Sequence, residues 1–514
     1  MKMRDGVGLR TRRIGPSDGG RRPTVLVRTP YGIGWQLPLP VLPLIARFFA
    51  QRGYHVVLQD TRGRYSSEGD FYPFVHELAD GRDTLQWIGE QPWFDGHLGM
   101  WGGSYFGYTQ WAAALDAPPF LEAVVPIVTS TDFHGFFYPG GAFSLASALR
   151  WASSNGQRRA GFPPERRLPA AFRQRPLRHA TRALGRRVGF FEDWAEHPDA
   201  DSYWQAVNLP AVRQRSRVPA LSIAGTYDIF NQVQIEDYFA MRECTQLDLG
   251  PWAHGSWAIS ARRLGWKQTN PLGILRNSLA FLDHHLCGRE LERSRVLRYV
   301  QGRDCWEGAS DWPPPAAERQ RFYLRAGGRL EREAPGGDEV PDCYLYDPAN
   351  PVPTRGGTFL GPRAGPADQR PLETRSDILR YQTPPLARPL EMAGPVRLRL
   401  FASSDAPATD FTGKLVHLPA DARRPALNLC EGIRRLSRIE SDILELEVDL
   451  WNASAAIPAG DRLRLEVSSS NFPRFDAHPN SRGNPALASA AKPARQSIHH
   501  AADAASYLEL YALS

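Results

Sequence analysis

The sequence predicts an α/β core with a helical insertion, followed by an all-β domain, and three observations carry this prediction. Short apolar runs alternate with helical stretches up to about residue 130, which is typical of a mostly parallel sheet covered on both faces. The alternation stops near residue 131 and resumes at residue 218. Beyond residue 316, strand-like segments separated by Pro, Gly, Asp and Asn replace it. A chain of 514 residues is long enough for several such domains.

Each predicted strand of the core is an apolar run that leads into a polar loop. In chain order these strands lie in "TVLVRTPYG" (24–32), "GYHVVLQDTRGR" (53–64), "LGMW" (98–101), "LEAVVPIVTS" (121–130), "VPALSIAGTYDIF" (218–230) and "TQLDLGPWAHGS" (245–256). Helical spacing of apolar residues predicts helices over 43–53, 79–93, 105–114 and 277–288.

Residues 133–213 are rich in aromatic residues, Arg and Ala, with helical patches but no strong strand pattern. We therefore expect four segments: 1–132 and 214–315 as the two parts of the core, 133–213 as a helical cap, and 316–514 as the β domain. In the last segment, "GPVRLRLFASS" and "ILELEVDLW" alternate apolar and polar residues, as strands with one solvated face do. A sandwich or a jelly roll fits this pattern.

The net charge of +7 comes largely from the cap, where eleven Arg and one acidic residue lie between positions 150 and 187. A basic patch of this kind could bind nucleic acid, but neither an aromatic stacking platform nor a binding motif accompanies it. We interpret the segment as a solvated helical surface and expect no nucleic-acid partner.

The cysteine pattern and the first residues predict a soluble, cytoplasmic protein. The five cysteines are widely spaced, odd in number and without a CxxC pair, which favours free thiols in a reducing compartment. The opening residues, "MKMRDGVGLR", contain no apolar stretch, so we expect no signal peptide. No run of about 18 apolar residues occurs, so we expect neither a membrane span nor a membrane partner.

Ser104 lies in "LGMWGGSYFGYTQWAA" (98–113), where a strand, a tight turn and a helix follow one another. This is the arrangement of a nucleophile elbow, in which a strained turn presents a serine side chain. Only small neighbours let the strand and the helix approach so closely. Gly102 and Gly107 bracket Ser104 as G-x-S-x-x-G, whereas the common elbow would place Gly at the position of Phe106. The alternative is that Ser104 is a packed structural serine.

Two later loops offer an acid and a base for Ser104. A serine hydroxyl needs an adjacent base to become a nucleophile, and in this type of sheet the order along the chain is Ser, acid, His. Asp228 ends the strand "ALSIAGTYD", and His254 follows the strand "TQLDLG". The nearest competing acid, Asp248, lies inside its strand rather than at the end. We expect Asp228 and His254 to complete a triad with Ser104.

A tetrahedral oxyanion formed at Ser104 needs preorganised hydrogen-bond donors. The backbone N–H of Tyr105, directly after the nucleophile, is one of them by geometry. The loop "RTPYG" offers a second in Tyr31, whose phenol could reach the oxyanion; a packing role for this tyrosine is the alternative.

The other histidines give no sign of a metal site. Those at 284–285 and 499–500 are adjacent pairs, and neighbouring side chains diverge on both a helix and a strand. The sequence contains no HExxH and no spaced Cys/His cluster. We therefore expect no metal and no cofactor.

Motifs in a fixed order run along nearly the whole chain except the cap. They are "RTPYG", "VVLQDTRGRYSSEGDF", "DGRDTLQWIGEQPW", "GMWGGSYFGYTQW", "GTYDIF" and "GPWAHGS", continued by "YDPANPVPTRGG", "LNLCEGIRR" and "RLRLEVSSSNFPRFDAHPN". In this order they resemble the cocaine-esterase and X-prolyl-dipeptidyl-peptidase (CocE/NonD) family of α/β-hydrolases. The resemblance implies an α/β-hydrolase core, a helical cap, and a C-terminal jelly roll that closes over the site.

The family's elbow, G-x-S-Y-x-G, fits positions 102 to 107. By position, the resemblance implies these roles: Ser104 as nucleophile, His254 as base, Asp228 as orienting acid, and Tyr31 with the Tyr105 N–H as oxyanion donors. Family members usually carry further residues before "MRDGVGLR", so two alternatives stay open: a shortened first edge strand, or a start codon that was placed late. Many of them self-associate, so a homo-oligomer is compatible with the resemblance.

We expect a serine hydrolase that cleaves carboxylic (acyl) esters through a covalent acyl-enzyme, with a small-molecule ester or a short peptide as substrate. One alternative is an X-Pro dipeptidyl-peptidase or an α-amino-acyl ester or amide hydrolase, which would need carboxylates near the acyl pocket to pair with a buried ammonium. The cap has few acids, clustered late between Glu192 and Asp201, which favours the ester. A remote alternative is a non-catalytic ligand-binding protein with a decayed core.

Overall fold

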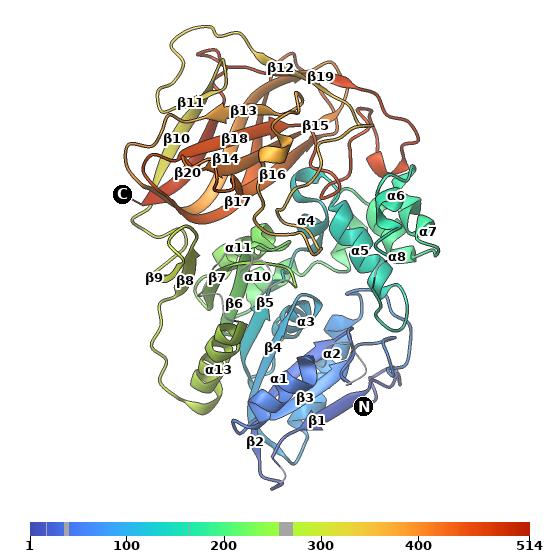
Figure 1. Ribbon diagram of the computed structural model, residues 1–514. Coiled ribbons are helices and arrows are strands. Elements are labelled where there is room, and N and C mark those ends of the chain that lie inside the picture. The colour runs from blue at the N-terminus through green and yellow to red at the C-terminus, as the bar shows by residue number, and fades with distance from the viewer. Residues whose placement is uncertain (17, 35–40, 163, 256–270, 514) are drawn as a thin grey trace.

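Two sheets, built from consecutive parts of the chain, lie one above the other, and a group of helices packs beside their junction (Figure 1). The computed structural model describes residues 1–16, 18–34, 41–162, 164–255 and 271–513. A mostly parallel sheet with helices is followed by an all-β part, which confirms the predicted fold class. The four domain boundaries stay a prediction.

Within the described residues, the first sheet has nine strands in the order β1-β3-β2-β4-β5-β6-β7-β8-β9. They are β1 (Thr11–Ile14), β2 (Arg22–Thr29), β3 (His55–Asp60), β4 (Phe94–Gly103), β5 (Leu121–Ile127), β6 (Ala220–Tyr227), β7 (Thr245–Ala253), β8 (Val296–Val300) and β9 (Cys305–Ala309). Every neighbouring pair from β3 to β8 is parallel, and the two edge strands pair antiparallel. The carboxyl ends of β4, β6 and β7 therefore meet at one edge, where open α/β sheets bind their ligands.

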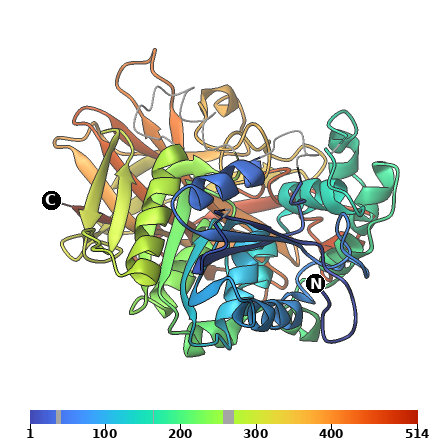
Figure 2. The same cartoon turned by 90° about the horizontal axis from the view of Figure 1, so that it is seen from below.

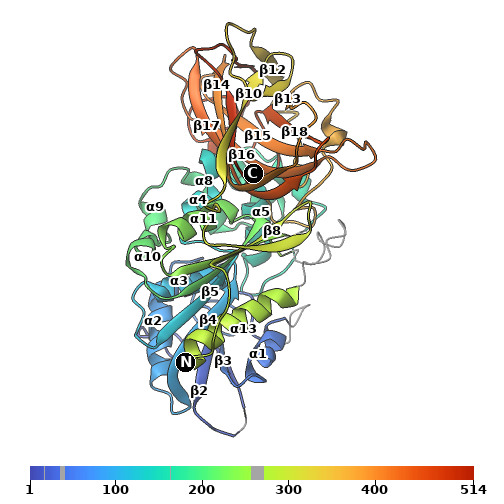
Figure 3. The same ribbon diagram turned by 90° about the vertical axis from the view of Figure 1, so that its left-hand side faces the viewer.

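Helices cover both faces of this sheet, as Figures 2 and 3 show. The helices of the core are α1 (Val41–Ala50), α2 (Glu77–Gly89), α3 (Tyr105–Ala114), α11 (Asn231–Ala240) and α13 (Pro271–Cys287). Helices α1 and α13 lie on one face, and α2 and α3 lie on the other. Helix α3 has the predicted bounds and is buried almost all round, because the sheet lies on one side of it and the cap on another. The predicted helix 79–93 instead starts at Glu77 and ends at Gly89.

The segment between β5 and β6 is helical, as the sequence predicts. Its helices are α4 (Phe133–Phe137), α5 (Leu145–Asn155), α6 (Leu168–Phe172), α7 (Ala180–Ala183), α8 (Gly189–Glu196), α9 (Ser202–Gln205) and α10 (Pro210–Arg215), with 3₁₀ turns at Pro139–Gly141 and Leu177–His179. Their apolar residues share one core with α3, which joins the cap to the sheet.

Arg182 and Arg187 pair with Glu192 but stay largely solvated, so this part of the basic segment is a solvated surface. In the described part of the chain, no helix has the length and apolar character needed to cross a bilayer.

The second sheet contains the strands described after residue 317. They are β10 (Glu318–Arg325), β11 (Arg329–Glu331), β12 (Asp342–Tyr346), β13 (Leu379–Gln382), β14 (Leu390–Ser404), β15 (Thr409–Leu418), β16 (Leu427–Leu436), β17 (Leu444–Ile457), β18 (Arg462–Ser468), β19 (Ala494–Ile498) and β20 (Tyr507–Leu513), with 3₁₀ turns at Arg370–Leu372 and Pro485–Leu487. Strand β14 and residues 444–450 of β17 alternate more buried and less buried residues, as predicted. Strand β18 has the same alternating sequence but no solvated face: Arg464 and Glu466 are buried and pair with each other.

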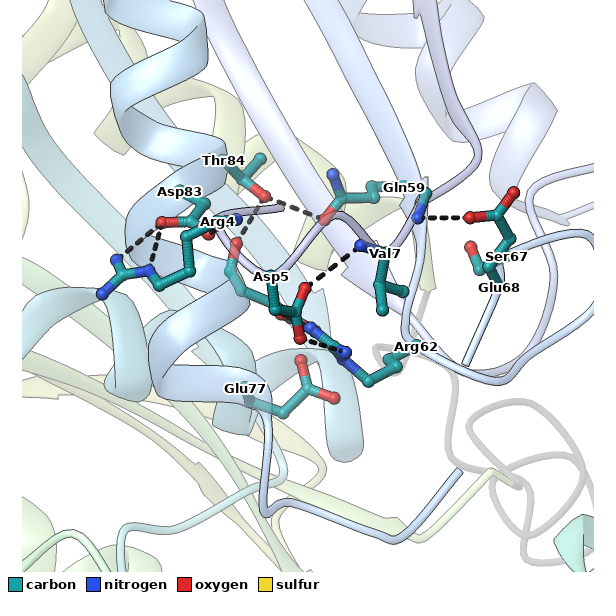
Figure 4. A network of polar contacts seen from close by, with 12 residues as sticks. Arg4, Asp5, Val7, Gln59, Arg62, Ser67, Glu68, Glu77, Asp83 and Thr84 are labelled. Atoms are coloured by element: carbon teal, nitrogen blue, oxygen red, sulfur yellow. Dashed lines mark hydrogen bonds and ion pairs between the residues drawn. The ribbon is translucent and has the colours of Figure 1, made fainter. Parts of the chain in front are cut away.

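Ion pairs hold the first residues of the chain on the core (Figure 4). Arg4 reaches Asp83 of α2 through two nitrogens, at 2.8 and 2.6 Å. Arg62, in the loop after β3, binds both Asp5 and the buried Asp80. These contacts fix the loop after β3 against α2 and the N-terminal segment.

Asp60, the last residue of β3, is a fully buried carboxyl group. Burial raises its pKa to about 7, although Arg10 and Arg64 act in the opposite direction. An unfolded Asp titrates near pH ~3.9. Between about pH 4 and 7 the folded state therefore keeps a proton that the unfolded state releases, so this group lowers the stability as the pH rises through that window. Above about pH 7 both states are ionised and the loss, up to about 4 kcal/mol, is complete.

We expect Asp60→Asn to be more stable than the parent protein at pH 8 and to lose most of that advantage at pH 4, because the amide stays neutral throughout. Urea unfolding at both pH values measures the difference. The exposed Asp70→Asn is the control and should show no such pH-dependent gain. A stability difference between Asp60→Asn and the parent that is the same at pH 4 and pH 8 would contradict the raised pKa.

Candidate active site

Ser104 stands on the sharp turn between β4 and α3, with backbone angles of φ 59° and ψ −128°. A residue with a side chain is strained in this region, so its surroundings must hold it there. The Ser104 N–H donates to the Ile127 carbonyl of β5 at 2.8 Å, and the Ser104 carbonyl accepts from the N–H groups of Gly107 and Tyr108. These bonds fix the turn on both sides of the serine.

Phe106 takes the place of the Gly in the common elbow, and its ring fits because Gly102 has no side chain. A Cβ atom on Gly102 would lie 2.1 Å from the Phe106 ring. That ring packs edge-on against Tyr31, with centroids 6.0 Å apart. Gly107 is needed as well, since a Cβ atom there would lie 2.5 Å from Thr129. The two glycines therefore let the strand, the helix and an aromatic ring meet at one turn.

Ser104, His254 and Asp228 form one hydrogen-bonded chain at the carboxyl edge of the sheet. Ser104 Oγ lies 3.0 Å from His254 Nε2, and His254 Nδ1 lies 2.9 Å from Asp228 Oδ2. An ionised carboxylate can only accept, so Nδ1 carries the ring proton and Nε2 accepts from the serine hydroxyl. The structure thus brings together the three side chains that the sequence predicts for a triad.

Asp228 is held by its position at the end of β6. It is fully buried, and its other oxygen, Oδ1, accepts from the Phe230 N–H at 2.9 Å. The competing acid Asp248 is engaged elsewhere, with Arg293 at 2.5 Å and Asn277 at 2.8 Å. Asp228, and not Asp248, is therefore the acid that lies within hydrogen-bond distance of the His254 imidazole.

The two predicted oxyanion donors lie beside Ser104. Tyr105 is the first residue of α3, so its N–H has no acceptor within the helix. Tyr31 follows β2, and its hydroxyl contacts the Ser104 side chain. The Tyr31 oxygen also accepts a hydrogen bond from Trp151 Nε1 at 3.0 Å. Burial raises the pKa of Tyr31, so the phenol keeps its proton and can donate.

A mostly apolar pocket lies against Ser104 and His254. Its other described lining residues are Phe74, Tyr105, Phe133, Phe136, Phe137, Ser147, Trp151, Ile229, Phe230 and Leu360. None of these described residues is an Asp or a Glu. The core, the cap and the β domain all contribute to this set, and the N–H of Leu360 ties the β domain to the cap by donating to Ser147 Oγ at 3.2 Å. Such a lining suits an uncharged, apolar acyl group.

Sequence reasoning missed most of this pocket. Trp151 and Phe133 lie in the cap, where no motif was recognised, and Leu360 lies in a loop of the β domain. The aromatic richness of residues 133–213 was the available signal, but it could not say which rings face the serine. The contacts that select them join distant segments: Trp151 meets Tyr31, 120 residues away, and Leu360 meets Ser147, 213 residues away.

A buried ion pair supports the first turn of α3. The Tyr105 hydroxyl donates to Glu77 Oε1 at 2.8 Å and accepts from the Phe74 N–H at 2.8 Å. Glu77 in turn lies 3.1 Å from the Arg28 guanidinium, and both side chains are buried. This network fixes Tyr105, and with it the backbone N–H beside Ser104.

Three of the four paired histidines have hydrogen-bond partners. His284 faces a backbone carbonyl, His499 bonds Ser403, and His500 bonds Asp342. Among the residues that the structure describes, no group of three or more His, Cys, Asp or Glu could hold a metal ion.

Comparison with known proteins gives matches along the whole chain. Residues 5–256 match the family described as X-Pro dipeptidyl-peptidase (S15 family), and residues 291–509 match the X-Pro dipeptidyl-peptidase C-terminal non-catalytic domain. The chain is 36% identical to cocaine esterase of Rhodococcus sp. (strain MB1 Bresler), over 94% of this chain and 92% of that protein.

Two solved structures are similar over nearly their full length. An aminopeptidase from the marine sediment archaeon Thaumarchaeota archaeon superimposes with a TM-score of 0.85 at 27% identity, covering 100% of this chain and 95% of that one. An α-amino acid ester hydrolase also gives a TM-score of 0.85, at 25% identity, covering 99% and 95%. The chain therefore belongs to the family of cocaine esterase and the X-Pro dipeptidyl-peptidases, and it is a serine hydrolase that acts on esters or peptides.

Proposed function

We propose that this chain hydrolyses carboxylic esters of apolar acyl groups, with Ser104 as nucleophile, His254 as base and Asp228 as orienting acid. The observation that carries the proposal is the unbroken hydrogen-bonded chain from the Ser104 hydroxyl through His254 to the buried Asp228. An alcohol, an imidazole and a carboxylate in this order activate a serine in several unrelated folds.

The reaction proceeds in two halves. Ser104 Oγ bonds to the ester carbonyl carbon while its proton passes to His254 Nε2, and Asp228 stabilises the imidazolium. When the tetrahedral intermediate collapses, the bond to the alkoxy oxygen breaks, and that oxygen takes the proton from His254 and leaves as the alcohol. Water then adds to the acyl-enzyme by the same route, which releases the carboxylic acid and restores the serine.

The negative charge on the carbonyl oxygen is stabilised by the Tyr31 hydroxyl and the Tyr105 N–H. Removing a donor of this kind typically costs about 3–4 kcal/mol of transition-state stabilisation. The raised pKa of Tyr31 supports its role, because the phenol stays protonated at neutral pH. The hydroxyl of Tyr105, in contrast, donates its hydrogen bond to Glu77, so we do not assign it as an oxyanion donor.

The second candidate is hydrolysis of α-amino-acyl esters or of peptides at their amino end. The likeness to an aminopeptidase and to an α-amino acid ester hydrolase supports it. A buried ammonium, however, needs a carboxylate partner, and the described lining of the pocket includes none. Of the cap's acids, Glu192 pairs with Arg182, and Asp193 accepts from the Tyr72 hydroxyl. These observations, together with the higher identity to cocaine esterase, favour the ester.

We also propose that the protein works in a reducing compartment such as the cytoplasm. The thiols of all five cysteines are free, which supports this location.

Ser104→Ala is expected to lower kcat for a p-nitrophenyl ester by about 10⁵-fold, because no other atom can form the acyl-enzyme. It should also abolish labelling by a fluorophosphonate probe, while the thermal melt stays close to that of the parent. Ser66→Ala, an exposed serine outside the pocket, is the control and should keep both activities. Retained turnover in folded Ser104→Ala would overturn the assignment.

A matched pair of substrates distinguishes the two candidate activities. Phenylacetic acid methyl ester and phenylglycine methyl ester differ in one amino group only. We expect kcat/KM to be about 30-fold or more higher for the phenylacetyl ester, because the ammonium would lose its hydration without gaining a carboxylate. Ala-Pro-p-nitroanilide should be cleaved more slowly still. Equal or faster turnover of the amine-bearing substrates would favour the second candidate.

The buried network of Tyr105, Glu77 and Arg28 beneath α3 predicts how much each substitution in it lowers the free energy of unfolding. Tyr105→Phe removes one hydroxyl and should cost about 1–2 kcal/mol in urea unfolding. Glu77→Ala leaves the Arg28 guanidinium buried without its carboxylate and should cost about 3–5 kcal/mol, whereas the exposed Glu90→Ala should cost little. Since the proposed donor is a backbone N–H, kcat of Tyr105→Phe should stay within about threefold of the parent. A tenfold loss would mean that the hydroxyl contributes to catalysis, either directly or by holding the Tyr105 N–H in place.

A further inference from the structure

The Tyr31 hydroxyl meets a side chain from the cap, Trp151 of helix α5. The two polar atoms, Trp151 Nε1 and Tyr31 Oη, lie 3.0 Å apart. An indole N–H can only donate, so the phenol oxygen is the acceptor in this bond. The phenolic proton of Tyr31 does not take part in this bond and points in another direction. The Tyr31 hydroxyl also interacts with the side chain of Ser104.

The indole of Trp151 is itself held in place. Its ring lies parallel to that of Tyr105, at an interplanar angle of 3° and a centroid distance of 6.2 Å. The ring of Phe190 packs against it edge-on at 5.8 Å. Trp151 therefore contacts both residues that we assign to the oxyanion hole, one by stacking and the other by a hydrogen bond.

A buried arginine ties the loop of Tyr31 to the same helix. Arg64 donates through Nε to the carbonyl of Pro30 at 2.7 Å, and through Nη1 to the carbonyl of Asn155 at 2.9 Å. Pro30 directly precedes Tyr31, and Asn155 lies one turn after Trp151. The distance between the Tyr31 loop and α5 is thus set by bonds that are independent of the Trp151 contact.

We propose that Trp151 is a positioning residue for the oxyanion hole: its N–H holds the Tyr31 hydroxyl so that the phenolic proton points at the developing oxyanion. A hydroxyl without this bond could rotate and donate elsewhere, and its oxygen would not be polarised by a second donor. The cap would then complete the catalytic site of the core as well as shape the acyl pocket. The inference rests on the proposed function, since it assigns a role within the same oxyanion hole.

A double-mutant cycle tests this inference. Trp151→Phe keeps an aromatic ring and removes the N–H, so kcat for a p-nitrophenyl ester should fall about tenfold with KM within about threefold of the parent. Tyr31→Phe alone should lower kcat by roughly 100-fold or more. In the Tyr31→Phe background, adding Trp151→Phe should change kcat by less than about twofold, because the hydroxyl that it positions is gone.

Two results would overturn the inference. One is a kcat of Trp151→Phe equal to that of the parent, whether or not KM is raised. Trp151 would then only line the pocket and would not position the Tyr31 hydroxyl. The other is an equal fold-loss in the presence and absence of the Tyr31 hydroxyl, since that is a packing effect. If Ser104→Ala is inactive while Trp151→Phe keeps its full kcat, this inference fails and the proposed function stands.

A matched control and an isosteric variant guard against misfolding. Trp194 lies beside Trp151, with ring centroids 5.8 Å apart, and is not among the described residues that line the pocket. Trp194→Phe should therefore leave kcat within about twofold of the parent. Replacing Trp151 by 3-benzothienylalanine, in which sulfur stands for the N–H, keeps the shape of the ring. It should reproduce the tenfold loss of kcat, and a parental kcat in this variant would also overturn the inference.

Discussion

The strained backbone of Ser104 is the constraint on which the site depends. A φ of 59° turns the chain from β4 into α3 within one residue, so the serine side chain and the first free N–H of the helix leave the turn together. The strain persists because the bond to Ile127 anchors the turn to β5, and because α3 is buried between the sheet and the cap. A side chain at Gly102 would clash with the Phe106 ring, and one at Gly107 would clash with Thr129, so either substitution would distort this turn.

The rest of the site is arranged around that turn by the parallel sheet. Strands β6 and β7 end at the same edge as β4, so a side chain just beyond each of them reaches the serine without a long loop. Asp228 is buried with both oxygens bonded, one to a backbone N–H and the other to the imidazole. The imidazole therefore has a fixed tautomer and a fixed direction before any substrate binds.

The other two parts of the chain contribute to the lining of the pocket beside Ser104. The cap supplies most of the aromatic lining, and the β domain adds Leu360, which is bonded to the cap through Ser147. A second link joins the Phe143 N–H of the cap to Asp476, itself paired with Arg435 of β16. Because the cap and the β domain are tied to each other here, the pocket beside Ser104 is formed by both of them together with the core.

The sequence by itself determined the elements whose signals are local. The elbow, the helix 105–114 and the strand ends that precede Asp228 and His254 follow from short patterns of Gly, apolar residues and turns, and the order of strands and helices fixed the fold class. Only the tertiary structure decided which cap rings face Ser104, that Asp248 bonds Arg293 and Asn277 instead of the imidazole, and that the polar residues of β18 are buried. It also decided that Tyr31 meets Trp151. The physical reason is the same in each case: these contacts join segments distant in the chain, and no local pattern encodes which distant side chain fills a given space.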